Sequence, residues 1–166
     1  LAFAAGDPAE ALAQAMTSLR YVGVGVSFAG DDGRLVWPLA ARLKHALGHY
    51  ADEAELLALY DAQPKGAVAP LQSAEAVLIR ARLSASRGEP GAAAQFEAAI
   101  ESMRRLSPPY HLAHGLLDYA EFLQGDPDHT VIPLLLEEVI TIAAKLRCDP
   151  LTARAEALAV SLARSD

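Results

Sequence analysis

The sequence is poor in the residues that build disulfides, metal clusters and aromatic cores. Its 166 residues include a single cysteine, Cys148, which excludes an internal disulfide and a cysteine-based zinc cluster. Only 6% of the residues are aromatic although 52% are hydrophobic, so alanine and leucine carry the excess. Both are strong helix formers, and the composition therefore favours a helical chain.

Long apolar runs and an excess of positive charge are also missing. The longest apolar stretches are short, as in residues 131–136, whereas a transmembrane helix needs roughly 20 apolar residues. Lysine and arginine number 14 against 21 aspartate and glutamate residues, a net charge of −7. We therefore expect neither direct nucleic-acid binding nor a membrane as partner. The lone cysteine and the lack of a charged-then-apolar leader favour a cytoplasmic location.

A glycine–acid–proline sequence occurs three times, at Gly6-Asp7-Pro8, Gly88-Glu89-Pro90 and Gly125-Asp126-Pro127. Gly48 stands between the first two without the proline, and the intervals between the four glycines are 42, 40 and 37 residues. Glycine ends a helix in a left-handed conformation, the acid caps the next helix, and proline fits its first position. Each occurrence therefore predicts a tight turn between antiparallel helices.

Apolar residues on both sides of these turns recur at helical spacing. The predicted buried stripes are Leu71, Ala74, Leu78, Ala81 and Ala85; Ala93, Phe96, Ile100 and Met103; Leu112, Leu116, Tyr119 or Ala120, and Leu123; Ile132, Leu135, Leu136, Val139, Ile140, Ala143 and Leu146; and Leu151, Ala155, Leu158, Ala159 and Leu162. We predict an all-α solenoid of about four helical pairs, closed by a C-terminal capping helix, as one domain over residues 1–166.

The first half of the chain is less regular. A helical pair is expected from about residue 36 to 62, with Pro38 in the opening turn of its first helix. Alternating glycine and valine in residues 21–26 are compatible with a strand, but we favour a frayed helix end and a loop through Asp31-Asp32-Gly33. The start at Leu1, in what reads as a helix already under way, predicts a piece of a larger polypeptide.

Small residues at packing positions, such as Ala81, Ala92 and Ala120, resemble those of the tetratricopeptide-repeat (TPR) superfamily. The turn glycines and Tyr50, two residues after Gly48, fit the same pattern. The repeats drift from the 34-residue period of that family, and its tryptophan-leucine-glycine-tyrosine set is incomplete. The resemblance covers nearly the whole chain and implies a TPR-like right-handed superhelix.

Residues 81–126 are also similar to the C-terminal helical arm of large bacterial signal-transduction ATPases. These include MalT- and LuxR-type transcription regulators and cyclase-linked ATPases. The resemblance implies a ligand-sensing or protein-contact arm that follows an ATPase module. The ATPase and DNA-binding motifs of those proteins are absent from this sequence, so the resemblance transfers no catalytic residue.

The sequence favours no enzyme and no cofactor. Gly23-Val24-Gly25 is not a dinucleotide loop, because the third glycine is replaced by Phe28. Glu137 and Glu138 are adjacent and diverge on a helix, so we expect a solvated acidic surface rather than paired catalytic carboxylates. Cys148 is interpreted as a packing residue at a helix end.

His111, His114 and Asp118 lie on successive turns of one predicted helix, a spacing that can hold a metal but is more typical of a helix surface. In a TPR-like array the first helix of each pair lines a concave groove where partners dock. The candidate groove residues are Arg80, Ser84, Arg87, Tyr110, His111, His114 and Asp118.

The predicted function is a non-catalytic protein-interaction or ligand-sensing module of a larger bacterial regulator. Its partner would be a protein or peptide, or else a small ligand. The alternative is a self-association module, a homodimer formed through apolar residues such as Leu1 and Phe3 at the cut end of the array.

Overall fold

The computed structural model describes residues 7–20, 28, 30–64, 66–125 and 130–164. Its helices are α1 (Pro8–Arg20), α2 (Asp31–Ala46), α3 (Tyr50–Asp61), α4 (Pro70–Ser86), α5 (Ala92–Leu106), α6 (Pro109–Leu123), α7 (Ile132–Leu146) and α8 (Asp149–Leu162). No strand occurs in these ranges, so the all-α prediction is confirmed. Within the same ranges, no helix is both long enough and apolar enough to cross a membrane.

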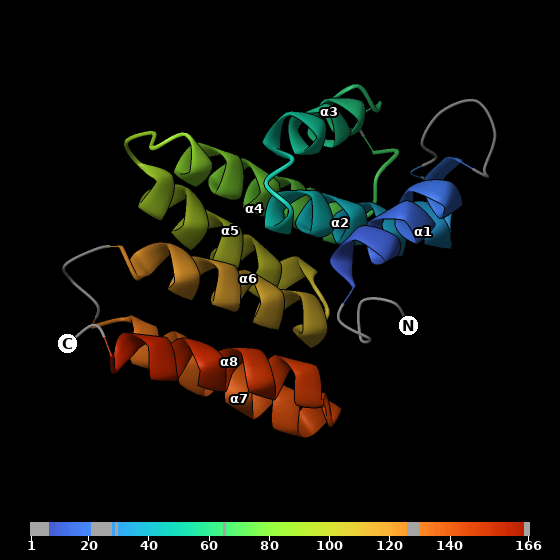
Figure 1. The fold of residues 1–166 in the computed structure, drawn as a ribbon. Coiled ribbons are helices and arrows are strands. Elements are labelled where there is room, and N and C mark those ends of the chain that lie inside the picture. Colours follow the sequence, from blue (N-terminus) through green and yellow to red (C-terminus); the bar gives the residue numbers. More distant parts are fainter. Residues whose placement is uncertain (1–6, 21–27, 29, 65, 126–129, 165–166) are drawn as a thin grey trace.

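Helices that follow one another in the chain pack side by side, and alternate helices also meet. Figure 1 shows the chain passing from α1 through α4 and α6 to α7 and α8 at the opposite end of the molecule. α2 packs on α4, α4 on α6, and α6 on α8. These even-numbered helices therefore form one connected row, which brings side chains from distant parts of the sequence together.

Asp7 starts α1 in the way that the sequence predicts. Its Oδ1 accepts hydrogen bonds from the backbone N–H groups of Ala9 and Glu10, both at 3.0 Å. Pro8 is the first residue of the helix, where an N–H would have no helical partner. Gly6 lies outside the described residues.

Gly48 and Gly88 follow α2 and α4 with φ values of 74° and 63°, in the left-handed region that glycine tolerates. The next amide turns back onto the helix in both cases. His49 N–H donates to the Lys44 carbonyl at 2.8 Å, and Glu89 N–H donates to the Ser84 carbonyl at 3.0 Å. These bonds satisfy carbonyl groups that the helix end leaves free, so both predicted turns are confirmed.

The restart after Gly88 differs from the prediction. α5 begins at Ala92 rather than at Pro90, because Gly91 adopts a second left-handed conformation (φ 89°) and takes the N-cap position. The turn therefore contains two left-handed glycines. Asp126 and Pro127, which follow Gly125, lie outside the described residues.

The start of α2 corrects two predictions. Asp31, Asp32 and Gly33 form its first turn instead of a loop, and Pro38 lies in the helix interior instead of the opening turn. An interior proline costs about 3 kcal/mol because it removes a backbone hydrogen bond and crowds the preceding turn. Trp37, fully buried beside it, supplies compensating packing. Residues 21–27, for which we predicted a frayed helix end, lie outside the described residues.

The buried side chains form two clusters, with α4 between them. The N-terminal core consists of Ala11, Ala15, Leu19, Phe28, Trp37, Ala40, Ala41, Leu43, Leu56, Leu57, Ala76, Ile79 and Leu83. The C-terminal core joins α4 to α5, α6, α7 and α8 around residues such as Leu78, Phe96, Leu116 and Val139. α4 contributes to both cores with different faces, so it ties the two halves together.

Most of the predicted apolar stripes are buried. Phe96, Ile100 and Met103 on α5 are 1%, 4% and 0% exposed. Ile140 and Leu146 on α7 contradict the prediction, because they are 44% and 43% exposed. Among the described helices α7 packs mainly against α6 and α8, and its Glu138 pairs with Arg104 of α5, so it buries a narrower face than its seven-residue stripe implies.

Candidate binding cleft

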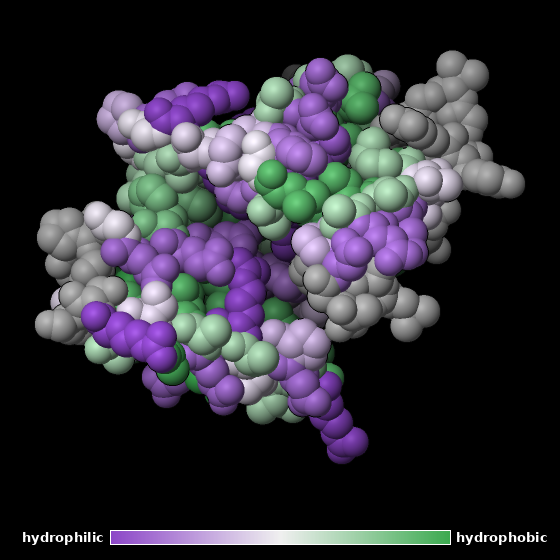
Figure 2. Space-filling view, viewed as in Figure 1, coloured by the Kyte–Doolittle hydropathy of each residue, from purple (hydrophilic) through white to green (hydrophobic). Residues whose placement is uncertain are grey.

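A cleft of about 540 Å³ opens along the row of even-numbered helices. It is lined by Arg42, His45, Ala46, Arg82, Tyr110, His114, Asp118, Glu121, Cys148, Pro150, Leu151 and Arg154. All four helices of the row contribute, together with the α7–α8 turn at Cys148. Figure 2 shows this side of the molecule hollowed between α2 and the α6–α8 half, with hydrophilic residues gathered along the hollow.

Three of the candidate groove residues line the cleft: Tyr110, His114 and Asp118, all on α6. The ring of Tyr110 stands edge-on to that of His114, with centroids 4.7 Å apart. His111, a fourth candidate, is 8% exposed and lies next to the cleft residues without lining it. Its Nδ1 lies 2.6 Å from Glu75 Oε1 on α4.

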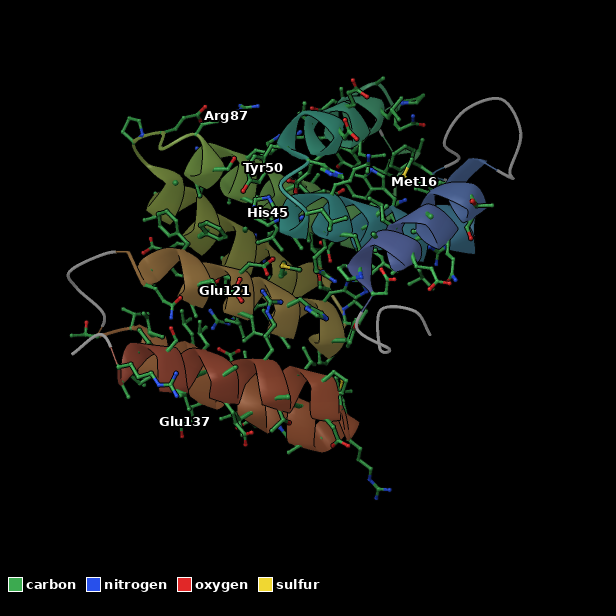
Figure 3. The ribbon with its side chains drawn as sticks, viewed as in Figure 1. Met16, His45, Tyr50, Arg87, Glu121 and Glu137 are labelled. Carbon is green, nitrogen blue, oxygen red and sulfur yellow. The ribbon has the colours of Figure 1, made fainter. Side chains whose placement is uncertain are left out.

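Arg80, Ser84 and Arg87 are not brought to this cleft. Arg80 pairs with Asp61 at the end of α3. Ser84 donates to Glu89 Oε2 at 2.7 Å, and Arg87 lies 3.5 Å from the other oxygen of that carboxylate. Figure 3 shows Arg87 at the tip of the α4–α5 turn, away from Glu121 on α6.

Arg82 reaches the cleft from α4 instead. It stands two residues after Arg80, and side chains two apart on a helix point in different directions. Arg82 is 2% exposed and donates from Nε to Glu53 Oε1 at 3.2 Å. Its Nη1 donates to Asp118 Oδ2 at 3.0 Å. One guanidinium therefore links a fully buried carboxylate of α3 to a carboxylate of α6.

The chain of ion pairs continues from α6 to α8. Arg154 Nη2 donates to Asp118 Oδ1 at 2.8 Å and to Glu121 Oε2 at 2.8 Å. Its Nε donates to Glu121 Oε1 at 2.9 Å, so Arg154 and Glu121 form a two-point pair. Removing one partner of the buried Arg82–Asp118 pair leaves an uncompensated charge and costs about 3–5 kcal/mol. The Arg154–Glu121 pair is partly exposed and contributes less.

A second group of charges lies where α2 meets α4. Arg42 Nη2 donates to Glu75 Oε1 at 3.4 Å, the same oxygen that His111 approaches. His45, also on α2, has its Nδ1 2.7 Å from Glu53 Oε2. Every helix of the row therefore carries at least one side chain of this charged network.

The network favours the ionised forms of Asp118 and Glu75. Burial would raise the pKa of Asp118, but Arg154, Arg82 and Arg42 together keep the pKa of that carboxyl well below its usual range. Glu75 behaves in the same way: burial opposes ionisation, and the hydrogen bond to His111 together with the charge of Arg42 keeps its pKa below the ordinary value.

His114 is held neutral. Burial, followed by the charge of Arg42, lowers the pKa of His114 to about 2, although Asp118 acts in the opposite direction. Its Nδ1 lies 3.4 Å from Arg154 Nη1, a donor, so this nitrogen is the acceptor of the neutral ring. Nε2 then carries the proton, and within the described residues it has no hydrogen-bond partner.

The sequence does contain a signal for the residues that we did not predict. The pairs Arg82–Asp118 and Asp118–Arg154 are each separated by 36 residues, and Arg154 and Glu121 by 33. Opposite charges placed about one repeat apart on first helices predict contacts between neighbouring repeats. Arg82 and Arg154 could have been found in this way.

No metal centre emerges from the described residues, because no three histidine, cysteine, aspartate or glutamate side chains in them are arranged to hold an ion. Comparisons with family models, curated proteins and solved structures find no match to this chain. The resemblance to signal-transduction ATPases therefore remains a prediction.

Proposed function

We propose that this chain is a non-catalytic recognition module, and that its ligand or peptide partner binds in the cleft along α2, α4, α6 and α8. The observation that carries the proposal is the cleft itself, which combines apolar walls with a charged floor and is lined by four helices. Its volume of about 540 Å³ falls within the range typical of small-molecule sites. A His114 of pKa about 2 is no general base at neutral pH, which favours binding over catalysis.

We further propose that the helices form a TPR-like right-handed solenoid. Three features support this arrangement: the contacts between alternate helices, the left-handed glycines after α2 and α4, and ion pairs separated by 33 to 36 residues. In such an array the first helices line the surface where partners usually dock. Here the cleft lies along α2, α4, α6 and α8, which take the place of those first helices.

The module would act as the sensing arm of a larger cytoplasmic bacterial regulator, as the resemblance of residues 81–126 implies. Binding shifts such a parent protein between states only if the ligand has different affinities for them. The cleft joins helices from both halves of the chain, so an occupant would contact both halves at once.

A nuclear magnetic resonance titration tests the recognition role. We expect small ligands or short peptides from a mixed library to shift backbone amides of the four cleft-lining helices. Tyr110→Ala, which removes an exposed cleft wall, should weaken every such ligand, whereas Leu106→Ala should not, although the two side chains are 39% and 41% exposed. Ligands that shift only residues outside the cleft would refute the proposal.

Self-association is the second candidate. The last two helices expose the large apolar side chains Leu134, Ile140, Leu146 and Val160, between 43% and 66%. Such residues favour contact with another apolar surface. Leu1 and Phe3, the other residues expected in a dimer contact, lie outside the described residues. Sedimentation at increasing concentration would support this candidate if a dimer formed and Ile140→Glu abolished it.

A further inference from the structure

Three residues that line the cleft, Arg42, Arg82 and His114, hold a buried donor nitrogen without a hydrogen-bond partner among the described residues. That of Arg82 still lies 3.1 Å from Glu53 Oε1, so Arg42 and His114 are the two whose donors are unused there. Among the described residues, the guanidinium of Arg42 makes one hydrogen bond, to Glu75 at 3.4 Å, and its Nε has no partner. The Nε2–H of His114 also has no partner. Arg42 and His114 are 7% and 5% exposed, and both line the cleft. Unpaired buried donors are costly, so they mark a place where an acceptor would gain most.

The acceptors of the cleft are already engaged. The two oxygens of Asp118 accept from Arg82 and Arg154. Both oxygens of Glu121 accept from Arg154. Glu75 Oε2 is an acceptor without a partner in the described chain, but Glu75 does not line the cleft. The cleft therefore offers donors to a ligand and few free acceptors.

The electrostatic field points to the same ligand. Among the charges that act most strongly on the pKa of His114, those of Arg42 and Arg154 disfavour its protonation, and that of Asp118 favours it. This part of the cleft therefore repels an added positive charge and favours a negative one. Water exclusion strengthens that preference, because charges interact more strongly in a low-dielectric site.

The remaining walls are apolar. Leu151 and Pro150 at the start of α8, Ala46 at the end of α2, and the ring of Tyr110 border the same space. Apolar surface of a ligand that these residues remove from water adds to its affinity. A ligand that fits both parts needs an anionic head and an apolar body.

We propose that the cleft binds a small organic carboxylic acid with an apolar body. The carboxylate accepts hydrogen bonds from the Arg42 guanidinium and from His114 Nε2–H, while the body packs against Tyr110 and Leu151. A guanidinium suits a carboxylate because its donors match the two oxygens. This inference rests on the proposed recognition role of the cleft and names the chemical class of its ligand.

Calorimetric titration of the full chain with three probes of similar shape tests which charge the cleft prefers in a ligand. The probes are 4-phenylbutanoate, its neutral amide, and 4-phenylbutylamine. We expect the acid to bind at least about tenfold more tightly than the amide, the difference that one charge-assisted hydrogen bond supplies. The amine should bind more weakly than either.

Two variants test whether the acid binds at Arg42. Arg42→Gln should weaken the acid by about tenfold or more and leave the amide nearly unchanged. Arg80→Gln removes an exposed arginine of α4 that lies outside the cleft and should change neither. If Arg42→Gln fails to fold because Glu75 is left unpaired, the order of the three probes on the unmodified protein still decides the matter.

The outcomes separate this inference from the proposed function. Equal binding of acid and amide, or tighter binding of the amine, would overturn the carboxylate and leave a recognition cleft of another specificity. Binding of a peptide with a free C-terminus, without binding of the small acid, would also overturn it. If none of the probes and no member of the peptide library bound in the cleft, both proposals would be wrong.

Discussion

The two cores of the protein are built by different means. In the N-terminal core, Phe28, Trp37 and Tyr60 come from separate segments, and the ring of Trp37 lies 5.4 Å from each of the other two. Trp37 also donates from its indole N–H to the Leu56 carbonyl at 3.0 Å. The C-terminal core has an aromatic group too, Phe96 stacked on Tyr119 and Phe122, but its three rings come from α5 and α6 alone, and aliphatic stripes extend the core over five successive helices. The N-terminal core therefore depends more on one anchored side chain that joins separate segments, and the C-terminal core more on repeated packing.

The charged network joins these halves in addition to the apolar faces of α4. Glu53 belongs to α3, beside the N-terminal core, and Asp118 belongs to α6, beside the C-terminal core. Arg82 binds both carboxylates from α4. Buried ion pairs add little net stability compared with apolar packing, but they penalise arrangements that leave a charge unpaired. We infer that the network fixes how the two halves meet and so shapes the cleft between them.

The largest effects are expected from the anchor of each core. Trp37→Ala should lower the free energy of unfolding by about 4 kcal/mol, because a buried aromatic ring and a hydrogen bond are lost. Phe96→Ala should cost about as much, since Phe96 is 1% exposed and stacks on Tyr119 and Phe122.

Hydrogen exchange shows whether the cores differ. In Trp37→Ala we expect faster exchange in α1 to α3 and slow exchange retained in α6 and α7. Phe96→Ala should show the reverse pattern. Uniform acceleration in both variants would mean that the two halves unfold as one unit and that the comparison drawn above is wrong.

Removing the link between the halves should have the next largest effect. Arg82→Met keeps the aliphatic stem but leaves Glu53 and Asp118 without their shared guanidinium, and we expect a loss of about 3 kcal/mol in urea unfolding. Arg80→Met, an exposed arginine paired with Asp61, is the matched control and should cost less than about 0.5 kcal/mol. Equal losses would show that burial of the network is unimportant.

The neutral state of His114 predicts a dependence of stability on pH. Its folded-state pKa of about 2 lies below the ordinary value of 6.5, so the unfolded chain binds the proton more readily. Stability from this group is complete above pH 6.5 and is lost as the pH falls, at roughly 1.4 kcal/mol per pH unit. Asp118 and Glu75 add losses only near and below their ordinary values, around pH 4.

Urea unfolding between about pH 6 and pH 4.5 isolates this contribution, which should reach roughly 2 kcal/mol over the interval. His114→Gln should flatten the decline relative to the unmodified protein. His49→Gln, at an exposed position just before α3, should leave the slope unchanged. A decline of the same steepness in His114→Gln would contradict the assignment.

The sequence predicts the C-terminal half better than the N-terminal half, for a physical reason. Phe96, Ile100 and Met103 pack at helical spacing, and a repeating period is visible in sequence. The interior Pro38 of α2 is tolerated through contacts of Trp37 with Phe28, which precedes the helix, and with Tyr60 on α3. Local rules place a proline at a helix start, and they carry no information about such tertiary packing.

The candidate site was predictable to a similar extent. Tyr110, His114 and Asp118 could be named because they share one face of one helix. To choose Arg82 instead of Arg80, one would have to know how α4 is rotated about its own axis. α4 is buried on two faces, so its apolar pattern alone does not fix which polar residues meet α6. Opposite charges separated by 33 to 36 residues provide the missing constraint, as Arg82 and Asp118 illustrate.

The smallest effects concern the left-handed glycines that follow α2 and α4. Gly48 and Gly88 have positive φ values, and in neither case would an added Cβ meet an atom within 4 Å. Gly48→Ala and Gly88→Ala should therefore each cost about 1 kcal/mol, from backbone strain alone. Gly30→Ala, at an equally open position with φ −101°, should be nearly neutral and serves as the control. A much larger loss at one of the two turns would show that the halves differ in their turns as well as in their cores.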